Sequence, residues 1–146
     1  MKILYVGGFE LPDKNAAAQR VLSNAKLLRD GGCEVTLVGV DNNLEKGIRL
    51  EETRFIHEGF RCYSMRYPSS LVEWIRFLCS VSFLRHLEKV AFPDMVIAYN
   101  YPAPALYMLR RWCKKNGVKL LADCTEWYGP QGKGLYRLIK KLDTSI

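Results

Sequence analysis

The sequence lacks the two short motifs that mark the commonest nucleotide-binding folds. The segment after the first apolar run, Gly7-Gly8-Phe9-Glu10-Leu11-Pro12, does not match the G-x-G-x-x-G fingerprint of dinucleotide-binding proteins, and no P-loop pattern occurs in the 146 residues. These absences count against an enzyme that depends on a nicotinamide cofactor or on ATP. We therefore predict no cofactor.

The sequence has only two histidines, and its five cysteines are widely spaced. It contains no C-x-x-C pair and no zinc-type spacing, so no metal site is expected. An odd number of cysteines without a secretion signal favours buried, reduced thiols, because free cysteine packs as a small apolar residue. The five are Cys33, Cys62, Cys79, Cys113 and Cys124.

Long apolar runs are also missing. No stretch of about 18 uncharged apolar residues occurs, so a membrane-spanning helix is not expected. The N-terminal segment 1–8 has one basic residue and a short apolar run, which favours a buried strand over a secretion signal. The expected location is the cytoplasm, either free in it or at the inner face of the membrane.

Basic residues are in excess and unevenly distributed. The chain has 22 Lys and Arg against 15 Asp and Glu, a net charge of +7. Residues 103–146 contain nine basic and three acidic residues, whereas residues 1–102 are nearly balanced. This asymmetry favours anionic partners such as a membrane surface or phosphate groups, and the alternative is a solvated helix face. Because no nucleic-acid-binding motif accompanies the charge, no specific nucleic-acid partner is expected.

Short apolar runs that alternate with longer helical stretches predict an α/β fold. Strands are expected at Lys2–Val6, Glu34–Val40, Phe60–Arg66, Met95–Tyr99 and Val118–Asp123. Helices are expected at Ala16–Asp30, at about Ser70–Val90, at Pro102–Asn116 and at Gly134–Leu142, with loops at Gly7–Asn15 and Asp41–Glu58.

Right-handed crossovers place the carboxyl ends of parallel strands at one edge of a sheet. The expected fold is a three-layer α/β/α domain with a mostly parallel, doubly wound sheet of strand order 3-2-1-4-5. In this order the first and fourth strands flank the point where ligands collect. The loops Gly7–Ala16, Asn100–Pro104 and Thr125–Gly134 are predicted to meet there, which locates the candidate site.

The first of these loops has features that suit a phosphate or a sugar hydroxyl. Gly7 and Gly8 permit a close approach of the backbone, and the helix that begins near Asn15 directs its N-terminus at the same edge. Arg20, in the first turns of that helix, carries a fork of donors for a phosphate. The alternatives are a purely geometric role for the glycines and a plain surface charge for Arg20.

Polar and aromatic residues follow the last two strands at the same edge. Asn100 is a candidate for binding a hydroxyl, or for capping the turn. The segment after the fifth strand contains Thr125, Glu126 and Trp127, in which the carboxylate can accept a hydroxyl proton and the aromatic ring can stack on a sugar. Glu126 is the candidate catalytic residue, and the alternative is a loop that covers the core. Asp123, at the strand end, is predicted to be a buried hydrogen-bonding residue.

The predicted helix between the third and fourth strands is apolar over more than a narrow stripe. Apolar residues recur throughout residues 71–87, with Arg76 and Arg85 among them: Leu71, Trp74, Ile75, Phe77, Leu78, Val81, Phe83, Leu84 and Leu87. Packing on the sheet is the favoured interpretation. Contact with a membrane surface is the alternative, which gives a possible peripheral membrane association.

Two stretches of the chain resemble retaining glycosyltransferases of the GT-B fold, family 4 type. The first is the segment 12–21 followed by Gly31-Gly32-Cys33-Glu34-Val35, which is similar to the family's glycine-containing loop, helix and G-H-E-V strand. The second comprises the segments 93–99 and 119–127, which resemble its fourth and fifth strands. The family's paired glycines correspond here to Asn15-Ala16, and its histidine after the fifth strand corresponds to Thr125.

The resemblance implies a division of labour between two domains. Residues 1–146 would form a single Rossmann-like N-terminal domain that binds the acceptor, while the donor-binding C-terminal domain is absent from this chain. The implied reaction is transfer of a sugar from a nucleotide-sugar donor to a hydroxyl acceptor, with retention and without an obligatory metal, in cell-surface polysaccharide or glycolipid synthesis. The chain alone would be inactive. The alternative is a non-catalytic binding module, or one subunit of a split glycosyltransferase.

Overall fold

The sheet contains the five predicted strands and one more that the sequence pattern did not reveal. The structure is a computed structural model that describes residues 1–12, 14–73, 75, 84 and 92–125. The strands are β1 (Lys2–Glu10), β2 (Glu34–Asp41), β3 (Phe55–His57), β4 (Phe60–Arg66), β5 (Met95–Tyr99) and β6 (Lys119–Asp123). The helices with assigned bounds are α1 (Ala16–Asp30), the 3-10 helix η1 (Leu50–Thr53) and α4 (Ala103–Asn116).

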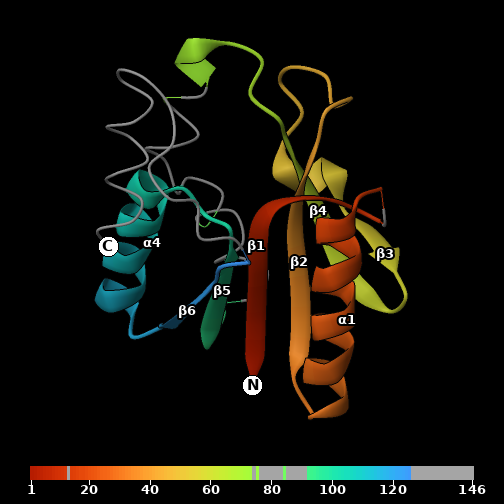
Figure 1. The fold of residues 1–146 in the computed structure, drawn as a ribbon, viewed down its shortest axis with the longest axis vertical. Helices are drawn as coiled ribbons and strands as arrows, with labels where there is room; N and C mark the ends of the chain where they lie inside the picture. The colour runs from red at the N-terminus through yellow and green to blue at the C-terminus, as the bar shows by residue number, and fades with distance from the viewer. Residues whose placement is uncertain (13, 74, 76–83, 85–91, 126–146) are drawn as a thin grey trace.

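The six strands form one sheet in the order β3-β4-β2-β1-β5-β6 (Figure 1). Every neighbouring pair is parallel except β3 and β4, which are antiparallel. The five predicted strands therefore have the predicted order 3-2-1-4-5. The result is an α/β fold with a mostly parallel sheet flanked by helices.

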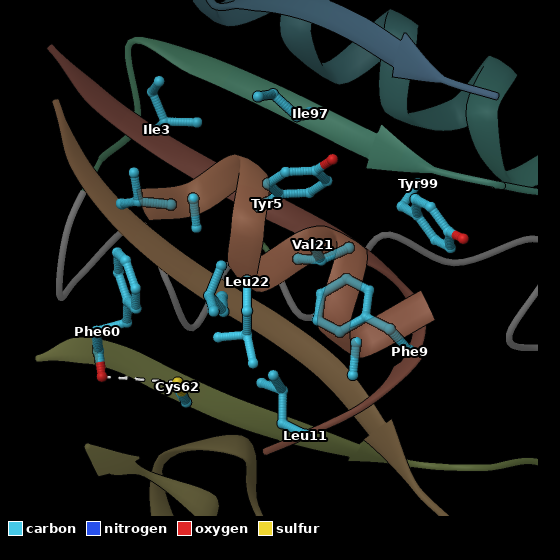
Figure 2. Close-up of a cluster of buried hydrophobic side chains, with 14 residues drawn as sticks. Ile3, Tyr5, Phe9, Leu11, Val21, Leu22, Phe60, Cys62, Ile97 and Tyr99 are labelled. Atoms are coloured by element: carbon cyan, nitrogen blue, oxygen red, sulfur yellow. Dashed lines mark hydrogen bonds between the residues drawn. The ribbon is translucent and has the colours of Figure 1, made fainter. Parts of the chain in front are cut away.

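One face of the sheet packs against α1. Ile3, Tyr5 and Phe9 of β1 lie in one buried cluster with Val21 and Leu22 of α1 (Figure 2). The helix supplies this contact because its apolar residues recur at i, i+3, i+4 and i+7, a spacing that places them on one side. Each such side chain stabilises the fold by about 1.5–3 kcal/mol when it is fully buried.

The alternate residues of β1 belong to a second cluster, because successive side chains of a strand point to opposite faces. Leu4 and Val6 lie there with Leu109 and Cys113 of α4. Leu84, whose neighbours in sequence are outside the described residues, is also buried in this cluster. The central strand is consequently covered on both faces, as the near-continuous apolar run of parallel strands predicts.

Local signals start and stop both helices. Asn15 is the N-cap of α1, and its side-chain oxygen accepts a hydrogen bond from the backbone N–H of Ala18 at 2.8 Å. Pro102 precedes the first turn of α4, where its missing N–H costs nothing. The chain leaves α4 at Gly117, whose N–H donates to the carbonyl of Cys113.

The prediction that Gly7 and Gly8 lie in a loop is wrong, because β1 continues to Glu10. Gly7 pairs with Tyr99 of β5, and a Cβ at position 7 would lie 2.5 Å from the Tyr99 carbonyl oxygen. Gly7 is therefore required for close strand packing. A Cβ on the exposed Gly8 would meet nothing within 4 Å.

The prediction that Asp41–Glu58 is mostly loop is also partly wrong. This segment contains η1 and the edge strand β3, which together cover the outer side of β4. His57, predicted in a loop, lies at the end of β3, where it pairs with Phe60. A strand of three residues with partial burial leaves too short an alternation to stand out in the sequence.

Of the predicted helix at 70–90, the structure describes only residues 70–73, 75 and 84. Leu71, Val72 and Glu73 are helical, and the N–H of Glu73 donates to the Ser70 hydroxyl at 3.3 Å, as expected of a cap. The predicted helix at Gly134–Leu142 lies outside the described residues. Within the described ranges no helix has the length and apolar character needed to cross a membrane.

Candidate functional site

The candidate site lies at the edge of the sheet where the five parallel strands end. From β1 the chain moves outward through β2 to β4 on one side, and later through β5 to β6 on the other (Figure 1). The strand order thus reverses between β1 and β5. In open parallel sheets this reversal opens a crevice at the carboxyl ends of the strands.

Two of the predicted site residues meet at this edge. The Asn100 side-chain amide donates to the Thr125 hydroxyl at 2.8 Å, and the backbone N–H of Thr125 donates to the Asn100 side-chain oxygen at 3.0 Å. Asn100 has a φ of +43°, a left-handed conformation that asparagine tolerates, and its own N–H donates to the Asp123 carbonyl at 3.0 Å. This reciprocal pair connects the chain after β5 to the chain after β6 and remains exposed to solvent.

A second polar network joins α1, β1 and β6. One carboxylate oxygen of Asp123 accepts a hydrogen bond from the Tyr5 hydroxyl, and the other accepts one from an Arg20 guanidinium nitrogen at 3.0 Å. The Asn24 side-chain amide lies 3.2 Å from the Tyr5 oxygen and 3.5 Å from the Asp123 carboxylate. Asp123 is therefore a nearly buried hydrogen-bonding residue, as predicted, with 12% of its side chain exposed.

Burial and charge determine the protonation state of this network. Burial of the Tyr5 hydroxyl, reinforced by its hydrogen bond to Asp123, raises the pKa of Tyr5 above its ordinary value. Tyr5 is consequently a phenol that donates to the carboxylate. The hydrogen bond to Asp123 also raises the pKa of the Arg20 guanidinium. The network thus pairs the Arg20 guanidinium with the Asp123 carboxylate.

Arg20 forms an ion pair with Asp123 that the sequence analysis did not predict. It is neither unpaired at the surface nor fully available to a phosphate, because it forms an ion pair with Asp123. Its side chain is still 50% exposed, and a guanidinium has five N–H donors. Arg20 can therefore hold Asp123 and present its remaining donors to a ligand at the same edge.

The other predicted residues divide between structural positions and the part of the chain that is not described. The Asn15 side chain caps α1. Gly7 is buried between strands, whereas Gly8 is exposed close to the carboxyl end of β1. Glu126 and Trp127 lie outside the described residues, so their predicted roles stay predictions.

Tyr5 and Asn24 belong to the site although sequence reasoning did not single them out. Asn24 follows Arg20 by four residues, a spacing that places both on one face of α1, and this signal was available. Tyr5 looked like one more residue of a buried strand. The role of its hydroxyl is visible only in the structure, because its partner Asp123 is 118 residues away in sequence.

A separate cavity of about 200 Å³ lies beside the end of β4. Its lining is mostly apolar, with Ile48, Leu50 and Met65, and also includes Ser64 and Arg66. No sequence pattern predicted this cavity, because most of its lining comes from the segment predicted as loop.

The arginine of this cavity is committed to internal contacts. Arg66 donates to Glu73 at 2.9 Å, to the Ser69 hydroxyl at 2.9 Å and to the Leu44 carbonyl at 3.1 Å. Hydrogen bonds from the backbone and hydroxyl of Ser69, followed by the contact with Arg66, lower the pKa of Glu73 to about 2. The cluster holds the chain after β4 in place, so it is a weaker ligand candidate than the β1–β5–β6 edge.

The thiols of the described residues differ in exposure. Cys62 and Cys113 are buried, and burial raises the pKa of each to about 11. Cys124 is exposed beside Thr125, contrary to the expectation of uniformly buried thiols. Among the described residues, no group of three or more His, Cys, Asp or Glu side chains is arranged to hold a metal ion.

Comparison with known proteins does not identify the chain. No protein-family model matches it, and no curated protein matches it significantly.

Proposed function

We propose that this chain is the acceptor-side domain of a GT-B glycosyltransferase, with a doubly wound, three-layer Rossmann-like arrangement. In this proposal the complete enzyme transfers a sugar from a nucleotide-sugar donor to a hydroxyl acceptor, in cell-surface polysaccharide or glycolipid synthesis. The resemblance of the segments 12–35, 93–99 and 119–127 to that family supports the proposal.

One structural observation supports it most directly, namely the gathering of hydrogen-bonding groups at the β1–β5–β6 edge. Asn100 and Thr125 present an amide and a hydroxyl to solvent there, and Arg20 presents part of its guanidinium. The amide and the hydroxyl are neutral donors and acceptors, which suit the hydroxyls of a sugar-like acceptor. The exposed Gly8 leaves open space beside them.

The proposal assigns acceptor binding, and not transfer, to these 146 residues. In this proposal the donor phosphates are bound by a second domain of the complete enzyme. Glu126 follows Thr125 directly in the sequence and remains the proposed group for acceptor contact or base chemistry, with Trp127 as the proposed stacking surface.

The proposal is tested by saturation-transfer NMR of the 146-residue chain with a panel of mono- and oligosaccharides and with nucleotide sugars. We expect saturation transfer to at least one saccharide, weakened by the variant Thr125→Val and retained by Thr125→Ser. Valine has nearly the shape of threonine but lacks the hydroxyl, so the pair isolates the hydrogen bond. Thr125 is exposed, so both variants should fold.

Three results would contradict the proposal. The first is the absence of binding to any saccharide in the panel. The second is saccharide binding that Thr125→Val leaves unchanged, since the site would then lie elsewhere. The third is turnover of a nucleotide sugar by this chain alone, because transfer would then need no further domain.

A further inference from the structure

The outward face of α4 is strongly basic. Arg110, Arg111, Lys114 and Lys115 are all exposed on it, and the helix contains no acidic residue. Residues three and four apart are neighbours on a helix surface, so these four cations form one patch. Lys119, at the start of β6, is also exposed a few residues beyond the helix end.

No carboxylate neutralises this patch within the part of the chain that the structure describes. The ion pairs there involve the cations of α1, of the segment 46–49, of β4 and of Lys14, and none involves α4. Unpaired cations at such spacing repel one another. Contact with an extended anionic surface therefore lowers the electrostatic free energy of the patch.

Apolar side chains are interleaved with these cations. Tyr107 is 50% exposed and Met108 is 37% exposed, and they precede Arg111 by four and three residues on the same face. At the border of the face Phe92, 44% exposed, packs against Trp112 with ring centroids 5.8 Å apart. The face thus combines positive charge with apolar side chains whose burial away from water is favourable.

We propose that the outward face of α4 docks the protein on an anionic phospholipid surface. The four cations contact lipid phosphates, while Tyr107 and Met108 enter the headgroup layer. Four to eight basic residues on an amphipathic helix are sufficient for such contact, at about 1 kcal/mol for each charge near the surface. The proposal is independent of the function proposed above, because α4's outward face does not include the β1–β5–β6 edge.

Lipid fits this face better than nucleic acid does. A phosphodiester backbone satisfies cations but offers no apolar partner for Met108, whereas the boundary between headgroups and acyl chains accepts both kinds of side chain. The opposite face of the helix is already occupied, since Leu109 and Cys113 pack on the sheet. The helix therefore lies along the membrane surface and does not insert.

The test is co-sedimentation of the 146-residue chain with two kinds of vesicle, phosphatidylcholine alone and phosphatidylcholine with about 30% phosphatidylglycerol. We expect binding to the anionic vesicles only, and loss of binding between about 0.05 M and 0.5 M salt. The variant Arg111→Glu/Lys115→Glu should weaken binding about tenfold or more. The control Lys2→Glu/Arg54→Glu changes the net charge equally at exposed positions outside α4 and should keep most of the binding.

A second pair of measurements separates lipid from nucleic acid. Tyr107→Ser/Met108→Ser should weaken vesicle binding about threefold or more, while its binding to a duplex DNA of random sequence stays unchanged. If circular dichroism shows that the charge-reversal variant is unfolded, Arg111→Gln/Lys115→Gln replaces it.

Any of three outcomes would overturn the proposal. One is no binding of the unmodified chain to anionic vesicles at low salt. Another is equal loss in the α4 variant and in its control, which would reflect net charge alone. The last is vesicle binding that does not change in Tyr107→Ser/Met108→Ser together with tighter binding to DNA, which would assign the face to nucleic acid.

Discussion

The helices α1 and α4 pack on the same sheet in similar ways but use their charged residues differently. On α1, Arg20 pairs with Asp123, Lys26 pairs with Glu58, and Arg29 lies 4.5 Å from the centre of the Phe60 ring. Each of these cations is directed at the protein itself. On α4 the corresponding cations face solvent and form no ion pair with the described residues.

This difference shows what a positive charge count does and does not say about function. Both helices contain several basic residues, and both bury an apolar stripe. On α1, Arg20 helps to shape the carboxyl edge of the sheet through its ion pair with Asp123, whereas Lys26 and Arg29 contact the turn between β3 and β4. The cations of α4 remain available to contact a binding partner. The two surfaces therefore predict different consequences for the same kind of mutation.

The largest effects should come from the apolar faces, where the two helices are alike. Leu22→Ala on α1 and Leu109→Ala on α4 should each lower the free energy of unfolding by about 2–5 kcal/mol, because each leaves a cavity in a packed core. Urea denaturation measures this. The control Leu27→Ala, at a position 71% exposed, should change stability by less than about 0.5 kcal/mol. A much smaller loss for only one of the core variants would show that its helix is not anchored as described.

The next largest effect should distinguish the buried hydroxyl beneath α1 from an exposed one on α4. Tyr5→Phe should lower the free energy of unfolding by about 1.5–3 kcal/mol, because it removes a hydrogen bond to the Asp123 carboxylate. Tyr107→Phe should have an effect below about 0.5 kcal/mol, since Tyr107 is half exposed. Chemical denaturation of both variants checks the contrast, and equal effects would remove Tyr5 from the network.

Alkaline pH should weaken the α1-side network. The folded state raises the pKa of Tyr5, whereas in the unfolded chain the phenol ionises at about pH 10. Above that pH the unfolded state binds fewer protons than the native state, so stability falls as pH rises. Tyr5→Phe should reduce this decline between about pH 10 and pH 12. Denaturation curves across that range test it, and an identical slope in the variant would contradict the raised pKa.

The smallest effects should have opposite signs on the two helices. Arg110→Gln should stabilise the protein by about 0.2–0.5 kcal/mol, because it removes repulsion from Lys114 at i+4. Lys26→Gln should slightly destabilise it through loss of the pair with Glu58. Melting temperatures at low salt measure both changes, and both should diminish at about 0.5 M salt. A loss of stability in Arg110→Gln would indicate a partner for that cation.

Much of the fold was predictable because its strands are short apolar runs. The bounds of α1, β4 and β5 match the predicted ranges, and the strand order matches as well. The prediction missed β3 because a three-residue edge strand carries almost no pattern. It also ended β1 too early, because Gly7-Gly8 resembles a turn where the structure uses Gly7 for close strand contact.

The candidate site was predictable in place but not in its contacts. The loops after β5 and β6 were expected to meet, and the Asn100–Thr125 pair confirms it. The same reasoning did not predict the ion pair between Arg20 and Asp123 and did not single out Tyr5. Both contacts depend on Asp123. In the sequence Asp123 does not differ from other acidic residues, and only the folded sheet places it beside Tyr5 and Arg20.

The sequence by itself determined the positions of five strands, the two apolar stripes of the helices and the excess of positive charge toward the C-terminal part. These properties depend on local periodicity and composition, which the linear chain carries. Only the tertiary structure decided which charges are neutralised. Arg20 and Asp123 are 103 residues apart, and their pairing exists only because β1, β5 and β6 lie side by side. The cations of α4 stay exposed for the same reason, since the sheet places no described carboxylate beside them.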